Sequence, residues 1–382
     1  MTRIAAGLST ADATARAAAE AARQAAGGLA AEPADLAFLF LSSEHQEEVE
    51  AAVAAVEEEL GPANLLGCVA QGVLARDREH EEGPAVAVWA ASLPGAHIEC
   101  FHAAAVPANG GVAVTGFPRP QDPALVTLLV DPFTFPAGPL LARLNEEHPG
   151  LALVGGLAAA ESPGEGVLVA EGEIHREGAV GAVIAGARVR TLVSQGCAPI
   201  GRDAVVTRAE GNVVFELAGK PALERLREEI EALPEHEQVL AARGLLAGLV
   251  IDENLPEYGR GDFLMRGLLG ADEDSGALAV GEAVRVGQTL RFHVRDAASA
   301  DKDLRQALDE LRGERVAGAL LFTCNGRGTH MFPEPHHDAR TVKEALGSEA
   351  LAGFFCGGEI GPVGGHTFLH GFTATMAVFL SD

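Results

Sequence analysis

The sequence predicts an α/β protein in which strand–helix–strand–hairpin units are layered, repeated about three times and divided between two domains. Short apolar runs that end in glycine alternate with amphipathic helical segments. The spacing between strand and glycine is similar each time, with 27 residues from Phe40 to Gly67, 27 from Leu129 to Gly156 and 31 from Phe322 to Gly353. One such unit cannot bury both faces of its sheet, so the repeat indicates units that pack on one another.

The first unit opens with an alanine-rich helix over residues 10–26. Thr10 or Asp12 can cap its start, and Gly27-Gly28 is expected to end it. The next elements are a buried strand, an acidic amphipathic helix and two further strands, expected at 36–41, 44–60, 65–68 and 85–91.

The second and third units repeat this order. In the second, a strand, a helix and a glycine-ended strand are expected at 125–130, 139–147 and 151–156, with a hairpin formed by 167–169 and 180–184. In the third, the corresponding elements are expected at 319–322, 338–346 and 351–355, with a closing strand at 372–380.

A different block separates the last two units. Residues 221–249 predict a long helix with Pro221 at its first position and an interruption near Pro234. Two strands and a helix follow, at 260–266, 287–295 and 301–311. We expect the domain boundary near 200–220, which gives domains of residues 1–205 and 206–382.

Composition excludes several function classes. The formal net charge of −26 repels phosphate backbones and anionic lipid heads, so neither a nucleic acid nor a membrane is an expected partner of this acidic protein. The five cysteines are odd in number and contain no CxxC pair, which indicates reduced thiols. The N-terminus lacks a signal pattern, and no run of 18 apolar residues occurs. A cytoplasmic protein is expected.

The common local signatures of enzymes are absent from the sequence. There is no GxxxxGK[ST] loop, no GxGxxG after a strand, no GxSxG and no HExxH. We therefore expect no nucleotide or metal cofactor, and we assign no catalytic residue.

Two glycine-rich loops follow apolar strands of the third unit. The first is Thr323-Cys324-Asn325-Gly326-Arg327-Gly328, and the second is Cys356-Gly357-Gly358-Glu359-Ile360-Gly361-Pro362. Loops at the carboxyl ends of neighbouring parallel strands emerge at one sheet edge, where ligands bind in α/β proteins. The alternative for each is an ordinary turn that carries a solvated charge.

The same region carries two weaker alternatives. His336, His337 and Asp338, with Cys324 and Cys356, are of zinc-ligand types, but their spacing is not compact and Asp338 can simply cap the next helix. A Cys–His nucleophile that uses either thiol is the other alternative.

These motifs resemble the FIST family. Residues 67–72 and 193–201 (Gly-Cys-Val-Ala-Gln-Gly and Val-Ser-Gln-Gly-Cys-Ala-Pro-Ile-Gly) resemble its N-terminal domain. The segments 260–263, 321–328, 353–362 and 370–375 resemble its C-terminal domain. The resemblance implies a sensory module of signal transduction that binds a small ligand such as an amino acid. No kinase, cyclase or F-box segment accompanies it here, so a partner protein is expected to provide the output.

The predicted function is thus a stand-alone intracellular sensor of a small ligand. Arg327 would bind the carboxylate of a zwitterion and Glu359 its ammonium group. The predicted ligand-binding residues are Cys324, Asn325, Arg327, Gly328, Cys356, Gly358, Glu359 and Gly361. The alternatives are an enzyme that uses Cys324 and Glu359 on a small amide or ester, and a protein-interaction scaffold.

Overall fold

The computed structural model describes residues 1–108, 111–120, 125–160 and 162–381. It confirms the mixed α/β class and divides the chain into two compact units. Unit 1 comprises Met1–Val193 and Arg305–Asp382, and unit 2 comprises Ser194–Leu304. This division differs from the expected one at 205/206, because the chain leaves unit 1 once and returns to it within helix α6 (Ala297–Asp309).

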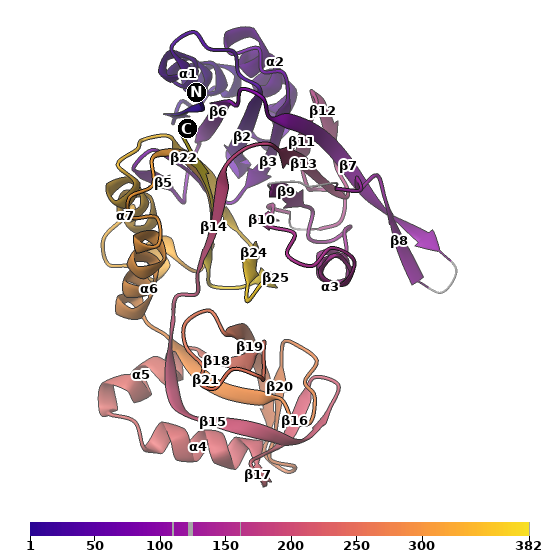
Figure 1. Cartoon of the computed structure of the whole chain (residues 1–382), viewed down its shortest axis with the longest axis vertical. Coiled ribbons are helices and arrows are strands. Elements are labelled where there is room, and N and C mark those ends of the chain that lie inside the picture. The colour runs from indigo at the N-terminus through magenta and orange to yellow at the C-terminus, as the bar shows by residue number, and fades with distance from the viewer. Residues whose placement is uncertain (109–110, 121–124, 161, 382) are drawn as a thin grey trace. The chain divides into compact units, whose positions relative to one another are not determined.

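Unit 1 contains three mixed sheets, which we call sheets A, B and C (Figure 1). In spatial order, sheet A consists of β1 (Arg3–Ser9), β6 (Val86–Ser92), β2 (Leu36–Ser42), β3 (Leu65–Ala70), β11 (Leu168–Ala170) and β12 (Glu173–His175). Sheet B consists of β14 (Val189–Ser194), β26 (Ala374–Leu380), β22 (Val316–Cys324), β23 (Leu351–Cys356), β4 (Val73–Ala75) and β5 (Arg78–His80). Sheet C consists of β8 (Gly111–Thr115), β7 (His97–Ala108), β13 (Ala179–Ala185), β9 (Leu125–Val130), β10 (Leu153–Leu157), β24 (Glu359–Val363) and β25 (His366–His370).

The three sheets share one strand order. A parallel pair (β2/β3, β22/β23 or β9/β10) lies at the centre of each, with an antiparallel strand on one side and an antiparallel hairpin on the other. The hairpin that follows each pair along the chain joins a different sheet: β4–β5 joins sheet B, β24–β25 joins sheet C and β11–β12 joins sheet A. The three strand–helix–strand repeats therefore exchange hairpins in a closed cycle. That the repeats superpose in space stays a prediction.

This exchange corrects one local prediction. The expected hairpin between 167–169 and 180–184 does not form, because β11 pairs with β3 in sheet A whereas β13 pairs with β7 and β9 in sheet C. Apolar runs close together in the sequence can pair with distant strands, and their composition does not specify the partner.

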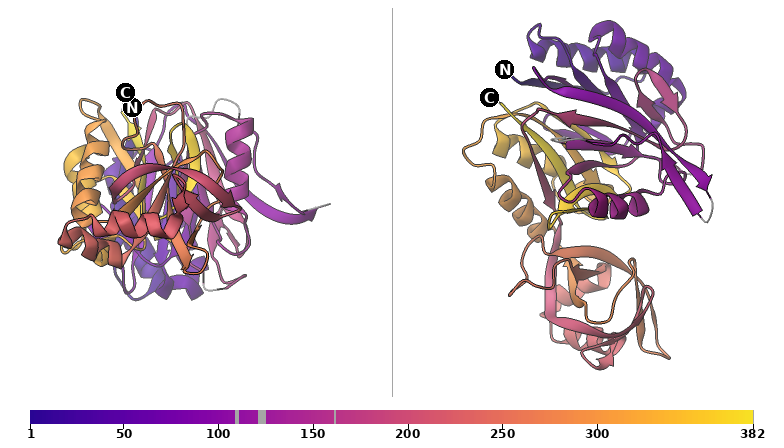
Figure 2. Two further views of the ribbon diagram at one scale, coloured as in Figure 1. Left: turned by 90° about the horizontal axis from the view of Figure 1, so that it is seen from below. Right: turned by 45° about the vertical axis from the view of Figure 1, so that its right-hand side comes forward.

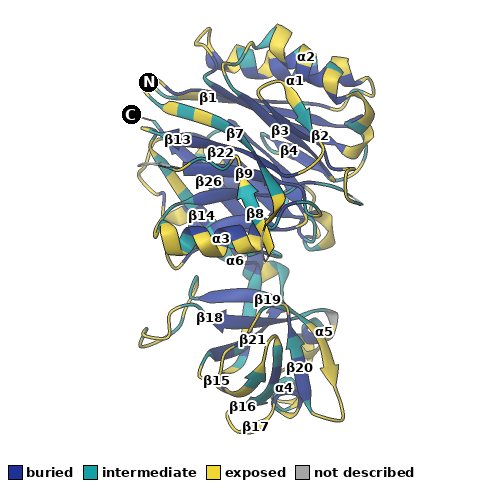
Figure 3. Cartoon of the chain, turned by 90° about the vertical axis from the view of Figure 1, so that its right-hand side faces the viewer, coloured by how far each residue is buried: buried dark blue, intermediate teal, exposed yellow. Residues whose placement is uncertain are grey.

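The inner faces of the three sheets meet in a common core that includes Phe38, Trp89, Leu129, Phe322 and Phe354. Helices cover the outer faces (Figures 1 and 2). The covering helices are α1 (Thr14–Leu29), α2 (Val49–Glu59), α3 (Ala137–Glu147) and α7 (His337–Leu346). Two short helical segments, η1 (Ser43–Glu48) and η2 (Gly328–His330), follow strands β2 and β22. Figure 3 shows buried strands between helices whose outward faces are exposed.

Helix α1 continues through the two glycines expected to end it and stops at Ala30, which is left-handed. Gly28 lies against β1, since a Cβ built on Gly28 would stand 2.6 Å from the Cβ of Ala5. The glycine therefore allows a close approach of helix and strand.

Unit 2 is an antiparallel sheet that closes on itself. Its strands, in spatial order, are β15 (Cys197–Glu210), β21 (Thr289–Arg295), β18 (Leu245–Val250), β19 (Phe263–Asp272), β20 (Ala277–Val280), β16 (Val213–Leu217) and β17 (Lys220–Pro221). An additional pairing of β15 with β16 completes the closure. The long helix expected over 221–249 is instead α4 (Ala222–Glu231), α5 (Glu235–Arg243) and strand β18.

No helix within the described part of the chain is both long and apolar enough to span a bilayer.

Candidate functional site

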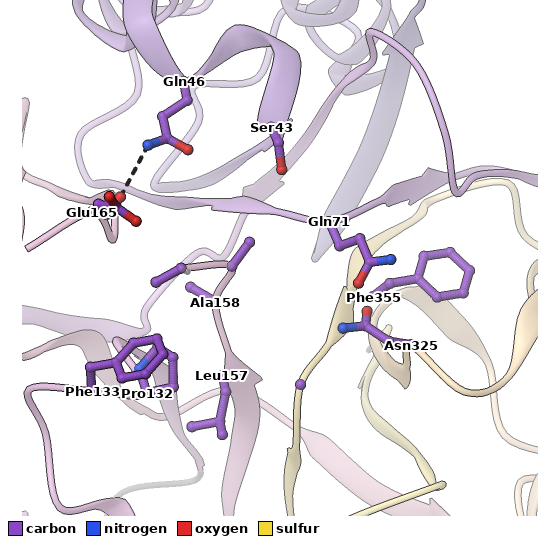
Figure 4. A pocket seen from close by; sticks show the side chains of 13 residues that line it. Ser43, Gln46, Gln71, Pro132, Phe133, Leu157, Ala158, Glu165, Asn325 and Phe355 are labelled. Carbon is purple, nitrogen blue, oxygen red and sulfur yellow. Dashed lines mark hydrogen bonds between the residues drawn. The ribbon is translucent and has the colours of Figure 1, made fainter. Parts of the chain in front are cut away.

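A cavity of about 780 Å³ opens in unit 1 where the carboxyl ends of the three parallel strand pairs converge (Figure 4). Its lining comes from all three sheets: Ser43, Gln46, Gln71, Pro132, Phe133, Leu157, Ala158, Ala159, Ala160, Glu165, Asn325, Phe355 and Gly357. Ligands of α/β proteins bind outside the carboxyl ends of parallel strands, and the volume lies within the range of small-molecule sites.

One local feature recurs in the three strand pairs. Gly67, Gly155 and Gly353 each pair with a leucine of the neighbouring parallel strand. A Cβ built on any of these glycines would lie 1.6–2.2 Å from the carbonyl oxygen of the paired leucine. Only glycine therefore permits the observed strand separation at these three positions.

The same pairs locate the cavity wall. Four residues after the leucines stand Ser43, Pro132 and Asn325, and four residues after the glycines stand Gln71, Ala159 and Gly357. All six of these residues line the cavity. The shared strand order of the three sheets thus brings one pair of loop residues from each strand–helix–strand repeat to a single cavity.

The polar side chains of the wall are three amides, one hydroxyl and one carboxylate. Gln71 and Asn325 point toward one another, and the Nε2 of Gln46 donates a hydrogen bond to the carbonyl oxygen of Glu165 at 3.1 Å (Figure 4). The Oδ1 of Asn325 is buried and accepts no hydrogen bond from any described residue. An unpaired buried acceptor is costly, so Asn325 is suited to accept from a ligand.

A second cavity of about 40 Å³ adjoins the first, since Gln71, Asn325 and Phe355 line both. Glu81 and Glu82 border it. Among the described residues, the walls of the two cavities contain glutamates but neither arginine nor lysine. This electrostatic setting disfavours a ligand with net negative charge.

Arg327 does not line the cavity; its side chain is fully buried behind the wall. Its Nε and Nη2 donate to the two carboxylate oxygens of Asp338 at 2.7 and 2.8 Å. Burial acts to raise the pKa of Asp338, but the charge of Arg327 and these hydrogen bonds outweigh it and hold that pKa well below its ordinary value. The guanidinium is therefore occupied by an internal ion pair. It does not line the cavity, where the expected contact with a ligand carboxylate would be made.

Glu359 is also fully buried, in strand β24. Its Oε2 accepts hydrogen bonds from the backbone N–H and the hydroxyl of Thr373, at 3.0 and 2.8 Å. Burial raises the pKa of Glu359 to about 8, against the opposing effect of these hydrogen bonds. Glu359 is thus occupied by Thr373 and does not line the cavity, where the expected contact with a ligand ammonium would be made.

Five other predicted site residues, two cysteines and three glycines, are also buried. Cys324 and Cys356 are buried partners in the parallel register of β22 and β23. Gly328 is left-handed, at φ 54°, and a Cβ there would collide with Glu81. Gly358 and Gly361 pack closely, against Leu157 and Thr375 respectively. Of the eight predicted residues, Asn325 is the one found on the wall of the large cavity.

The thiol of Cys356 is poorly placed for catalysis. Burial raises the pKa of Cys356 well above its ordinary value. The thiolate is the nucleophilic form, so burial of this kind makes a cysteine inert. The histidines expected as alternative metal ligands have other contacts: the Nδ1 of His336 accepts from the backbone N–H of Glu79, and His337 stacks on Phe332. No group of three side chains suited to a metal occurs in the described ranges.

Five lining residues, Ser43, Gln46, Pro132, Phe133 and Glu165, are not among the residues predicted for the site. Gln71 lies in the motif at 67–72 but is not among them either. The repeat in the sequence could have located these residues. Each parallel strand pair ends at a comparable position, so the loops of all three strand–helix–strand repeats are equally good candidates for a site.

Comparison with known proteins gives two family matches and several close relatives. The FIST N domain matches residues 35–220 and the FIST C domain matches residues 222–362. "Uncharacterized protein Rv0628c" of Mycobacterium tuberculosis (strain ATCC 25618 / H37Rv) is 48% identical over 384 residues, covering 99% of this chain and 100% of that protein. "Uncharacterized protein Mb0898c" of Mycobacterium bovis is 44% identical over 385 residues, covering 100% and 99%.

The chain therefore belongs to the FIST family, whose domains are associated with sensory signal transduction. The boundary between the two family domains, at 220–222, falls inside unit 2 and not between the compact units.

Proposed function

We propose that this FIST protein is a sensor that binds a small ligand in the 780 Å³ cavity of unit 1. The observation that carries the proposal is the convergence of one loop pair from each of three sheets on a single cavity. A ligand there contacts loops from all three sheets at once, so binding can favour one arrangement of the sheets over another.

The wall favours a neutral or zwitterionic ligand with an amino group, such as an amino acid. The amides of Gln71 and Asn325 can donate to a ligand carboxylate, and the Oδ1 of Asn325 can accept from an ammonium group. The side chain of Glu165 adds a negative charge at the rim, and Phe133 and Phe355 provide apolar surface. This arrangement replaces Arg327 and Glu359 as the direct ligand contacts.

The test is a thermal-shift screen of the full chain against the common amino acids, with calorimetry of every hit. Native mass spectrometry of the protein as purified from cells identifies a ligand that the screen omits. Asn325→Leu and Gln71→Leu should each weaken binding about tenfold or more, as loss of a ligand hydrogen bond does. Gln238→Leu, an exposed change in α5, is the matched control. Unchanged affinity in both cavity variants would overturn the assignment.

A further inference from the structure

Two segments singled out in the sequence do not contribute to the large cavity. They are the stretch 193–201, which leads into β15, and the stretch 260–263, which leads into β19. In the structure they meet: Gln195, Cys197 and Pro199 from the first, and Arg260 and Phe263 from the second, line one cavity of about 190 Å³. All of its lining residues belong to unit 2, so this cavity is separate from the site in unit 1.

One side of the cavity is aromatic. Phe263 and Met265 are buried, at 4% and 3% exposure. The ring of Phe263 meets the rings of Tyr258 and His293 edge to face, at centroid distances of 5.8 and 5.2 Å. Burial lowers the pKa of His293 to about 4, so its ring is neutral at pH 7. A flat apolar group can therefore pack here without meeting an unpaired charge.

The wall also carries two arginines with unequal counter-charges. The Nε of Arg260 lies 2.5 Å from Asp303, whose second carboxylate oxygen accepts from the backbone N–H of Gln195. Arg291 donates to the carbonyl oxygen of Gly201 at 3.1 Å and lies 3.7 Å from Asp203. Its Nε is buried and pairs with no described residue. Asp303 offsets Arg260, whereas Asp203, which is not part of the wall, approaches Arg291 only to 3.7 Å, so the wall itself holds two guanidinium groups and one carboxylate.

We propose that unit 2 holds a second ligand site, which takes a small aromatic carboxylate. The ring of the ligand packs against Phe263, Tyr258 and His293, and its carboxylate accepts hydrogen bonds from Arg291. Arginine is suited to this because its planar guanidinium matches a carboxylate. In a chain with a net charge of −26, a wall with excess positive charge selects anions that the rest of the surface repels.

The probe is benzoate, titrated into the full chain by calorimetry, with benzamide and benzylamine as neutral and cationic analogues. Benzoate should bind at one site and more tightly than either analogue. It should also slow alkylation of Cys197, a wall residue that is partly exposed, as followed by mass spectrometry of the modified peptide.

Variants localise the binding. Arg291→Gln should weaken benzoate binding about tenfold or more, the effect of losing a charge-assisted hydrogen bond. Arg285→Gln, an exposed arginine of the same unit, should leave it unchanged, and matched thermal melts show that both variants are folded. Equal affinity for benzoate and benzamide, full binding by Arg291→Gln, or no protection of Cys197 would each overturn the proposal. These outcomes leave the site in unit 1 unaffected.

Discussion

Arg327 and Asp338 form a two-point ion pair inside unit 1, with the arginine side chain fully buried and the aspartate side chain 2% exposed. The hydroxyl of Thr323 donates a third hydrogen bond to Asp338 at 2.8 Å. The pair joins the loop after β22 to the first turn of α7, and so fixes the backbone that presents Asn325 to the cavity.

Removal of the carboxylate should destabilise the protein strongly. Asp338→Asn leaves the Arg327 charge buried without its partner, and we expect a loss of about 3–5 kcal/mol in the free energy of unfolding. Urea denaturation measures it. The control is Asp309→Asn, whose ion pair with Arg312 is exposed and should contribute under about 1 kcal/mol. Similar losses in the two variants would contradict the role of the pair.

Stability should fall as the pH rises from about 5 to about 8. Burial raises the pKa of Glu359 to about 8, whereas an unfolded glutamate titrates near 4.5. Between these values the native state binds the additional proton, so raising the pH favours unfolding, by up to about 1.4 kcal/mol per pH unit for one group. Burial and the charge of Asp338 raise the pKa of Glu79 to about 8 as well, so Glu79 adds to the same slope.

The variant Glu359→Gln isolates its share of that effect. Its unfolding free energy should decline less steeply over this range than that of the wild type, as measured by urea denaturation at several pH values. Glu334→Gln, an exposed change, should keep the wild-type slope. If Glu359→Gln also kept it, Glu359 would be ionised in the native protein at pH 7.

Replacing Gly353 tests the close approach of strands β22 and β23. A methyl group there would stand 1.6 Å from the carbonyl oxygen of Leu321, so Gly353→Ala should destabilise unit 1 by at least about 1–3 kcal/mol. The same change at Gly27, where nothing lies within 4 Å of the added atom, should stabilise helix α1 by about 0.5–1 kcal/mol. Thermal melts of the two variants should therefore shift in opposite directions.

The thiols should divide into two classes under native conditions. Cys197 is partly exposed and should accept iodoacetamide. Cys68, Cys324 and Cys356 are buried, and burial raises the pKa of the partly exposed Cys100 thiol to about 12, so these four should react slowly or not at all. Denaturation without a reductant should make all five reactive, as counted by mass spectrometry. A count below five would indicate a disulfide or a bound metal in the purified protein.

Strands that are buried on both faces could be located from the sequence almost to the residue. Residues 125–130 and the run from Leu351 were both expected as strands. A short continuous apolar segment bounded by polar loops is typical of a buried strand. Strand β1 was missed, because Arg3–Ser9 is short and small-residued. The pairing partners of the strands could not be predicted, as the exchange of hairpins shows. They depend on the register between segments that are far apart in the sequence.

Both loops predicted to hold the site reach the large cavity, through Asn325 and Gly357, whereas Arg327 and Glu359 do not line it. An arginine between glycines suggests exposure, and Asp338, eleven residues further on, was assigned the role of a helix cap. Its pairing with Arg327 depends on how the loop folds back over α7, which spacing alone does not specify. Asn325, two residues earlier, is the side chain that reaches the cavity.

The cyclic exchange of hairpins also determines how unit 1 can come apart. Sheet A is completed by the hairpin β11–β12 of the second strand–helix–strand repeat, sheet C by β24–β25 of the third repeat, and sheet B by β4–β5 of the first. No third of the molecule is a finished domain by itself, so a fragment that ends near Ala185 would lack β22 and β23 and leave β4–β5 without a strand to pair with. We therefore expect the three sheets of unit 1 to be complete only once the final 80 or so residues of the chain have been added, and the loss of one hairpin to expose an edge strand of another sheet.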